Sequence, residues 1–402
     1  MIDLKLIPHD VLFFRDARPM AAGEGYGHGA QLPMPHHLHS AVRTALLRDK
    51  GDLGEVKKAV KGRNRQGVRE RTVSSTQFDD LRTVGPFLHH LDHGPLFPIP
   101  KDVLAIGPVK SADGKTTVDE QSISTSRLEN VGMQVLPLSA VPASKNRIDG
   151  FWDARQLSAY LSGDKHDFTA IGAVTSGTVA MKAGEWRMGI KIDPTRQSTV
   201  QGKIYAAEYM RLADGMSFVG QAGSKNSMAD GALAEKHLVV FGGERKLCDC
   251  VAVQNCMPEF CRPIIDGNGR FLVKWVLLTP ALFRGGSIPG WCMNTSDRDS
   301  LADGDVRLFG VDRPPKIRLL THAVGDSINL SGWDTVGHHP KATVKAVPAG
   351  AVYWFLCENG EAAAALVHKL HWQPRSDMYG EKGYGYGVCA TAPTQLEFPD
   401  SK

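Results

Sequence analysis

A glycine-rich segment near the C-terminus places the strongest constraint on the fold. It reads YGEKGYGYGVC from Tyr379 to Cys389, with glycines at 380, 383, 385 and 387 around Lys382, Tyr384 and Tyr386. Glycines let a backbone adopt positive φ angles and approach a ligand closely, and successive N–H groups can then surround a phosphate. The elements on either side of the segment decide which nucleotide-binding folds are compatible with it.

Those flanking elements exclude the two commonest nucleotide-binding folds. A dinucleotide fold requires a strand, then GxGxxG, then a helix, with an acidic residue about 20 positions later. Here a helical pattern, GEAAAALVHKLH, precedes the glycines, a strand-like pattern follows, and 15 residues remain after Gly387. A P-loop requires Lys and then Ser or Thr after its last glycine, whereas Val388 and Cys389 follow Gly387. The glycines therefore form a turn between a helix and a final strand.

This turn has two interpretations on its own residues. In the first, Lys382 supplies charge and Tyr384 or Tyr386 supplies a ring face for a base, a contact that contributes about 1–3 kcal/mol per base. In the second, it is a tight turn whose tyrosines pack on a neighbouring helix. The segment alone favours neither interpretation.

The order of strand-like and helix-like patterns predicts an α+β fold with two similar halves. The alternation in MIDLKLIPHD predicts a first strand, and LHSAVRTALLRD, which follows two prolines, predicts a helix. In the second half, RFLVKWVLLTPALF, PKIRLLTHAV and AVYWFLCE read as strands, and GEAAAALVHKLH as a helix. Each half approximates β-α-β-β-α-β, the ferredoxin-like (RRM-like) arrangement.

These patterns predict two ferredoxin-like domains. The first spans residues 1–260 and carries a large insertion at about 50–185, where regular patterns weaken and prolines accumulate. The second spans residues 265–402 and contains the glycine-rich turn. Within the first domain, WRMGIKID and KIYAAEYMRL, joined by DPTRQSTVQGK, predict a protruding hairpin.

Charge and cysteine content narrow the functional classes. A net charge of +4 is too small to establish a nucleic-acid partner, although residues 57–71 hold seven basic residues against one Glu. The N-terminus lacks the features of a signal peptide, and no apolar run reaches the roughly 18 residues of a membrane span. We therefore expect a cytoplasmic protein without a membrane partner. Cys248, Cys250, Cys256 and Cys261 lack a paired CxxC spacing, so we expect neither a metal nor another cofactor.

Catalytic motifs are also missing from the sequence. It contains no GxSxG or HExxH pattern and no Cys/His pairing at a useful spacing. His36 and His39 are i, i+3 neighbours at the start of a predicted helix, but no carboxylate or cysteine lies near them in sequence to complete a metal site. The residues therefore give catalysis little support, although the 15 histidines leave an enzyme open as the alternative.

An ordered series of segments resembles the RAMP-type CRISPR subunits, most closely the third-subunit family of the type III-B (Cmr) effector complex. The series begins with VLFFRDARPM, PHHLHSAVRTALL and GPFLHHLDHGPLFPIPKDVL. It continues with WRMGIKID and IYAAEYMRL, FGGERK, LSGWD with a later PKA, and finally the glycine-rich turn. The resemblance covers nearly the whole chain. One departure is Ala17, where relatives commonly carry glycine, so the loop conformation there is expected to differ.

The resemblance implies a non-catalytic, RNA-binding subunit with two ferredoxin-like domains. Such a subunit holds the 5′ tag of the guide RNA, docks the large polymerase-like subunit, adjoins the backbone RAMP subunits and meets target RNA only indirectly. The alternative within the same superfamily is an endoribonuclease that processes guide-RNA precursors, with His28, His36 or His39 as general acid or base. The long insertion and FFRDARP argue against this alternative.

The expected RNA contacts combine the resemblance with side-chain chemistry. Guanidinium groups bind phosphates in a bidentate manner, although Arg15 or Arg18 can instead pair with Asp16. A helix N-terminus also attracts phosphate. The tip of the predicted hairpin either touches RNA or a neighbouring subunit, or is solvated. The predicted RNA-binding residues are Arg15, Arg18, His36, His39, Arg43, Arg196, Gly242, Gly243, Arg245, Lys382, Gly383, Tyr384, Gly385 and Tyr386.

Overall fold

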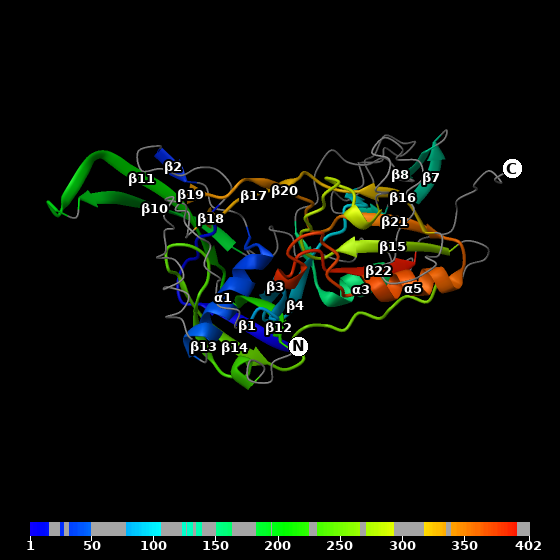
Figure 1. The fold of residues 1–402 in the computed structure, drawn as a ribbon, viewed down its shortest axis with the longest axis horizontal. Helices are drawn as coiled ribbons and strands as arrows, with labels where there is room; N and C mark the ends of the chain where they lie inside the picture. The colour runs from blue at the N-terminus through cyan, green and yellow to red at the C-terminus, as the bar shows by residue number, and fades with distance from the viewer. Residues whose placement is uncertain are drawn as a thin grey trace, which may run out of the picture.

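The computed structural model shows an α+β chain, as the sequence predicts, with mostly antiparallel sheets and few helices (Figure 1). The structure describes residues 1–15, 25–27, 32–49, 78–105, 123–125, 127–131, 134–138, 150–162, 182–193, 195–224, 231–265, 271–292, 317–334 and 339–391. Within this described part of the chain, no helix has the length and hydropathy needed to cross a membrane.

The first half is built on a seven-stranded sheet with β1 in its interior. β1 pairs antiparallel with β12 on one side and with β14 on the other. The sheet order is β13-β14-β1-β12-β3-β4-β9. In chain order these strands are β1 (Ile2–Pro8), β3 (Arg82–His90), β4 (Gly94–Pro98), β9 (Phe151–Trp152), β12 (Met216–Gly223), β13 (His237–Val240) and β14 (Leu247–Val253).

Helix α1 (Pro35–Asp49) packs on this first sheet. Its buried stripe includes Leu38, Val42, Ala45 and Leu46, which recur at helical spacing and share one hydrophobic core with strand residues such as Leu4. The helix starts at the proline of PHHLHS, where a missing N–H costs nothing. The predicted helix is therefore confirmed.

Strands β3 and β4 correct the predicted insertion. Residues 82–98 were expected to lie inside an irregular stretch at about 50–185, yet β3 pairs with β12 near the middle of the sheet. The prolines of GPFLHHLDHGPLFP hide the strand pattern. Pro86 lies where the register between β3 and β12 shifts, and such an irregularity tolerates the missing N–H of proline.

The second half has a four-stranded antiparallel sheet with the order β16-β21-β15-β22. Its strands are β15 (Phe271–Leu277), β16 (Ile317–Ala323), β21 (Val352–Cys357) and β22 (Gly387–Thr391). Helix α5 (Gly360–Leu370) connects β21 to the glycine-rich turn and packs on this sheet through residues that include Leu366. Its N-cap, Asn359, accepts a hydrogen bond from the Ala362 N–H at 2.8 Å.

The two halves share a hydrophobic core. Val84 and Phe97 of the first sheet belong to the same buried cluster as Leu272 and Trp354 of the second. Helix α3 (Ala154–Ser162) contributes Leu157 and Tyr160 to this cluster, although the insertion was predicted to include it. The halves are therefore joined by packed apolar side chains in addition to the chain itself.

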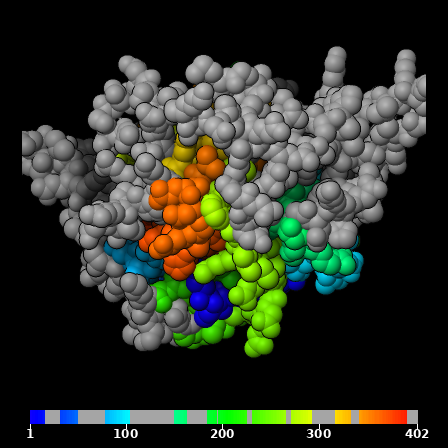
Figure 2. Space-filling model, turned by 90° about the vertical axis from the view of Figure 1, so that its right-hand side faces the viewer, coloured from blue at the N-terminus to red at the C-terminus, as the bar shows by residue number. Residues whose placement is uncertain are grey.

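The segment that links the halves lies against α5. His371 Nε2 donates a hydrogen bond to the Phe260 carbonyl oxygen at 2.8 Å, and Arg262 Nη1 lies 3.3 Å from His368 Nδ1. Figure 2 shows this yellow-green segment on the surface beside the orange C-terminal helix. Phe260 and Met257 also belong to the shared core, so the predicted boundary near residue 260 adjoins buried residues.

The predicted hairpin is present as β10 (Lys182–Asp193) and β11 (Ser198–Leu212), and it projects from the molecule (Figure 1). β2 (Gly25–Gly27) pairs parallel with β11 on the other side. The remaining elements are short pieces: β5 (Val103–Ala105), β6 (Ile123–Thr125), β7 (Arg127–Val131), β8 (Gln134–Leu138), β17 (Ile328–Leu330), β18 (Trp333–Asp334), β19 (His339–Pro340), β20 (Val344–Ala346), η2 (Gly290–Cys292) and η3 (Gly380–Lys382).

Candidate nucleic-acid interface

Two glycines of the glycine-rich turn adopt positive φ angles. Gly383 has φ of 95° and Gly385 has φ of 75°, a region that side chains disfavour. A Cβ atom on Gly383 would lie 3.0 Å from the Thr83 carbonyl oxygen, and one on Gly385 would overlap the backbone nitrogen of Ser376. The turn of the second half therefore lies closely against strand β3 of the first half.

The two tyrosines of the turn are packed inside the protein. Tyr384 is 1% exposed and Tyr386 is 4% exposed. The Tyr384 hydroxyl and Nδ1 of His36 form a hydrogen bond of 2.6 Å, and Tyr386 packs near Trp372 in the core that the halves share. Neither ring offers a face to a base, so of the two interpretations of the turn the structure shows the packed one for Tyr384 and Tyr386.

The first turn of α1 is closed by a reciprocal pair of hydrogen bonds. The Met34 N–H donates to Nδ1 of His37 at 2.9 Å, and the His37 N–H donates to the Met34 carbonyl oxygen at 2.9 Å. This pairing resembles a capping box in which His takes the place of Glu. Burial lowers the pKa of His37 to about 3, so the ring is neutral, and Nδ1 accepts from the Met34 N–H in the tautomer that carries its proton on Nε2.

Three cations from three separate segments gather around His36 and His39 at this end of α1. Burial, then Lys382 and Lys341, lowers the pKa of His36 to about 4. Burial, then Lys382, Arg43 and His36, lowers the pKa of His39 to about 4. Both imidazoles are therefore neutral at pH 7. The shared effects of Arg43, Lys341 and Lys382 show that these charges lie within electrostatic reach of one another.

Lys382 itself is half-buried in this basic cluster. Burial lowers the pKa of its ammonium group, the neighbouring Glu381 raises it, and Lys341 and Arg43 lower it further. Its Nζ lies 4.2 Å from the centre of the Tyr379 ring. Arg43 in turn makes an ion pair of 2.6 Å with the exposed carboxylate of Asp79. The cluster thus combines cations that repel one another with two carboxylate neighbours, Asp79 beside Arg43 and Glu381 at 3.9 Å from Lys382.

Lys341 was not among the predicted residues. It directly follows β19, is exposed, and donates its backbone N–H to the Gly332 carbonyl oxygen at 2.8 Å. The available signal was the PKA segment of the family resemblance, which contains this lysine. Only the tertiary structure places Lys341 beside a helix some 300 residues earlier in the chain.

The FGGERK segment, which holds the predicted residues Gly242, Gly243 and Arg245, forms another glycine-containing turn on the first half. The Gly243 N–H donates to the Phe13 carbonyl oxygen at 2.7 Å, and a Cβ on Gly242 would lie 2.5 Å from the same oxygen. Arg245 is exposed in this turn, and Arg15 is exposed two residues after Phe13. FGGERK therefore packs against the FFR segment, and the exposed Arg15 and Arg245 belong to these two segments. None of the residues of the basic cluster at α1 belongs to either segment.

Arg196, another predicted RNA-binding residue, does not lie near α1. Arg196 is exposed at the tip of the hairpin, which projects away from α1 (Figure 1). Its N–H and that of Thr195 donate to the Asp193 carboxylate at 3.2 and 2.8 Å. Arg18, His28 and Ala17 lie outside the described residues.

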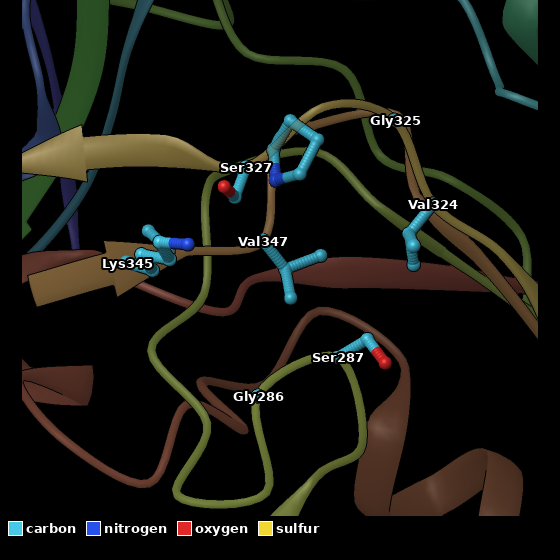
Figure 3. A pocket seen from close by; sticks show the side chains of 9 residues that line it. Gly286, Ser287, Val324, Gly325, Ser327, Lys345 and Val347 are labelled. Atoms are coloured by element: carbon cyan, nitrogen blue, oxygen red, sulfur yellow. The ribbon is translucent and has the colours of Figure 1, made fainter.

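The cysteine cluster and the pocket of the second half contain none of the residues of the basic cluster. Cys248 and Cys250 are buried in β14, and burial raises the pKa of each thiol to about 12. Within the described ranges, no three His, Cys, Asp or Glu side chains are placed to hold a metal ion. The pocket in Figure 3 is lined by residues of the second half that include Gly286, Ser287 and Lys345, and by none of the predicted binding residues.

The family comparison confirms the resemblance that the ordered motifs indicate. A family described as "CRISPR-associated protein (Cas_Cmr3)" matches residues 4–394. A chain of the type III-B Cmr-beta complex bound to cognate target RNA is 13% identical with a TM-score of 0.46, covering 88% of this chain and 86% of that one. A chain of the Csm3–Csm4 subcomplex of the type III-A interference complex is 11% identical with a TM-score of 0.35, covering 88% and 92%. No curated protein matches the chain.

Proposed function

The chain belongs to the Cas_Cmr3 family of CRISPR-associated proteins, and from this premise we propose that it is a non-catalytic, RNA-binding subunit of a type III-B effector complex. In this role it holds the 5′ tag of the guide RNA and docks the large polymerase-like subunit beside the backbone RAMP subunits. It contacts target RNA only indirectly.

The observation that carries the RNA-binding role is the basic cluster at the N-terminus of α1. Arg43, Lys341 and Lys382 oppose one another electrostatically in the free protein. A phosphate placed among them would relieve that repulsion, and the positive end of the α1 dipole would add to the attraction. His36, which is part-buried and neutral at pH 7, can hydrogen-bond RNA there without adding charge, whereas the predicted contact of His39 is opposed by its burial at 7% exposure.

The strand orders support two ferredoxin-like domains. In the first half, β14-β1-β12-β3 corresponds to the fourth, first, third and second strands of that fold. In the second half, β22-β15-β21-β16 gives the same order, with α5 between the third and fourth strands. We assign the domains to residues 1–260 and 265–402. The glycine-rich turn then lies between the last helix and last strand of the second domain.

Charge removal tests this role. We expect single changes Arg43→Ala, Lys341→Ala and Lys382→Ala to weaken retention of guide RNA in the assembled complex. Removal of one phosphate-binding cation should reduce the slope of log K against log salt by about 0.7 for single-stranded RNA. Binding titrations at several salt concentrations measure both effects.

A matched control is Lys236→Ala. Lys236 is exposed and pairs with Asp249 at 2.8 Å, on the β13–β14 side of the first sheet. It should leave both affinity and slope unchanged. Guide retention that is the same in all three cluster variants as in the wild type would contradict the proposed RNA site.

The guide-processing endoribonuclease is the second candidate. The observation that favours it is the pair of neutral imidazoles beside three cations, since a neutral imidazole can accept a proton from a ribose hydroxyl. The test is incubation of the purified chain with repeat RNA in the absence of metal. Cleavage at a single site would favour the endoribonuclease, and binding without cleavage would favour the non-catalytic subunit.

A further inference from the structure

A lysine lies inside the core that the two halves share. Lys274 stands in β15 between Leu272 and Val276, and both of these neighbours belong to the shared core. Alternate side chains of a strand point to the same face, so Lys274 points into this core, where its side chain is 6% exposed. A buried ammonium group costs free energy unless an anion pairs with it. The position of Lys274 therefore requires an acidic partner inside the core.

That partner comes from the first half. Nζ of Lys274 lies 3.5 Å from Oδ2 of Asp102, a fully buried carboxylate that follows β4. Its other oxygen, Oδ1, accepts a hydrogen bond of 2.6 Å from the Tyr160 hydroxyl of α3. Nζ of Lys274 also lies 4.0 Å from the centre of the Tyr160 ring, a cation–π contact. We call Lys274, Asp102 and Tyr160 the buried triad.

The backbone around Asp102 is itself held by the second half. The Lys101 N–H donates to the Gly350 carbonyl oxygen at 2.8 Å, and a Cβ on Gly350 would lie 2.6 Å from the Ile99 carbonyl oxygen. Burial, followed by the charge of Asp102 and the hydrogen bond to it, raises the pKa of Tyr160 well above its ordinary value, so the hydroxyl remains the donor. The buried triad therefore joins two backbones that already touch.

The buried triad contributes direction more than stability. Desolvation of two charges offsets most of their attraction, so a buried ion pair often adds no more stability than apolar residues of the same volume. Apolar contacts are non-directional, whereas a short hydrogen bond requires a defined geometry. Any placement of the halves that separates Lys274 from Asp102 would leave the ammonium buried without its carboxylate. The triad thus disfavours placements that the apolar side chains alone would tolerate.

The placement of the second half determines where the glycine-rich turn lies. β15 pairs with β22, and Ala390 of β22 lies opposite Lys274. β22 follows the turn that contains Lys382. This turn meets the first half at α1, where the Tyr384 hydroxyl bonds Nδ1 of His36 at 2.6 Å. A shift of the second half at Lys274 would therefore move Lys382 relative to α1.

We propose that the buried triad is a positioning element, which aligns Lys341 and Lys382 of the second half with Arg43 of α1. Its three residues are buried and act on the basic cluster only through the placement of the halves. The consequence for guide RNA rests on the proposed function, whereas the alignment of the cations does not.

A neutral replacement of the ion pair tests the proposal. Lys274→Met combined with Asp102→Asn removes both charges, keeps an amide oxygen for the Tyr160 hydroxyl and keeps an unbranched chain against its ring. We call this double variant the neutral pair. Each single variant should unfold at a lower urea concentration, because it removes one partner of a buried pair. The neutral pair should recover a urea midpoint near that of the wild type.

The position of the second half is read from His36. In the wild type, burial, Lys382 and Lys341 lower the pKa of His36 to about 4. In the neutral pair, NMR titration of this ring should show a higher pKa, because the contact of the turn with α1 loosens. Tyr160→Phe, which removes one hydrogen bond and keeps both charges, should raise this pKa by less.

Retention of guide RNA gives the functional readout. In complexes reconstituted with the neutral pair, guide RNA should bind roughly tenfold more weakly, within the range known for residues that do not contact the ligand. All three cations of the basic cluster are still present in this variant. A merely stabilising role of the triad would leave guide affinity unchanged once the urea midpoint is restored.

Val273→Ala is the matched control. Val273 precedes Lys274 in β15 but points to the opposite face, into the core of the second half, and is fully buried. It should lower the urea midpoint and leave both the pKa of His36 and guide retention unchanged.

Two results would overturn the proposal. One is a wild-type pKa of His36 in both the neutral pair and Tyr160→Phe. The other is an equal change of this pKa in Val273→Ala, since loss of stability alone would then explain it. Failure of the proposed function has a different signature, namely normal guide retention in Lys382→Ala while the pKa of His36 is still raised in the neutral pair.

Discussion

At the residue scale, the histidines at the start of α1 are defined by burial. His36, His37 and His39 belong to the first turns of a helix that packs on the first sheet, and burial is the largest cause of the lowered pKa of each. The sequence indicated that these residues lie at a helix N-terminus. It did not indicate that they are neutral, because neutrality depends mainly on burial and, for His36 and His39, also on cations that include Lys382 of the other half.

The lowered pKa of His39 predicts that acid destabilises the fold. The native pKa is about 4, below the ordinary value of 6.5, so the unfolded chain takes up a proton first as the pH falls. This contribution is complete above pH 6.5 and is lost as the pH falls toward 4. Between pH 7 and pH 5 the loss is about 2 kcal/mol in the free energy of unfolding.

The His39→Gln variant isolates this contribution. Urea titrations of both proteins at pH 7 and pH 5 should show a smaller loss of unfolding free energy for the variant. Other histidines with lowered pKa, such as His371, contribute equally to both proteins and cancel in the comparison. Parallel losses in the two proteins would mean that His39 is not held neutral.

At the element scale, regular amphipathic patterns predicted most of the helices and strands that carry the site. α1, α5 and the β10–β11 hairpin lie where their patterns placed them. β3 and β4 were missed because prolines and histidines interrupt their alternation. The conformation of the glycine-rich turn could not be predicted from the sequence. The positive φ angles of Gly383 and Gly385 and their close approach to Thr83 and Ser376 arise only in the folded protein.

Substitution of Gly385 tests that requirement. Gly385→Ala introduces a side chain at φ of 75° and a Cβ that overlaps the Ser376 backbone, so we expect at least about 2 kcal/mol of destabilisation. Gly202→Ala is the control, because Gly202 has φ of 71° and no atom near its Cβ position. It should cost about 1 kcal/mol, the backbone contribution alone. Equal losses in chemical denaturation would show that the turn can shift away from Ser376.

At the scale of the whole molecule, the shared core couples the two halves. Side chains of both sheets and of α3 form one buried cluster, and the glycine-rich turn of the second half lies on β3 and α1 of the first. The basic cluster exists only because of this contact. Its members, Arg43, Lys341 and Lys382, come from both halves.

Coupling through the core predicts a single unfolding transition. Leu272→Ala removes a side chain that is 2% exposed between the halves, so we expect a loss of about 2–5 kcal/mol. Calorimetry should show one endotherm that shifts as a unit to lower temperature. A second transition that stays at the wild-type temperature would mean that the halves unfold independently.

The sequence by itself determined the class of fold, the main helices, the hairpin and the family, because these depend on local periodicity and on the order of motifs along the chain. Tertiary structure alone decided which charged residues meet, which tyrosines are buried and which face of the hairpin is exposed. The physical reason is that electrostatic interaction and burial depend on distance in space. Lys341 and Lys382 act on His36 across some 300 residues of chain, and no pattern within one segment records that proximity.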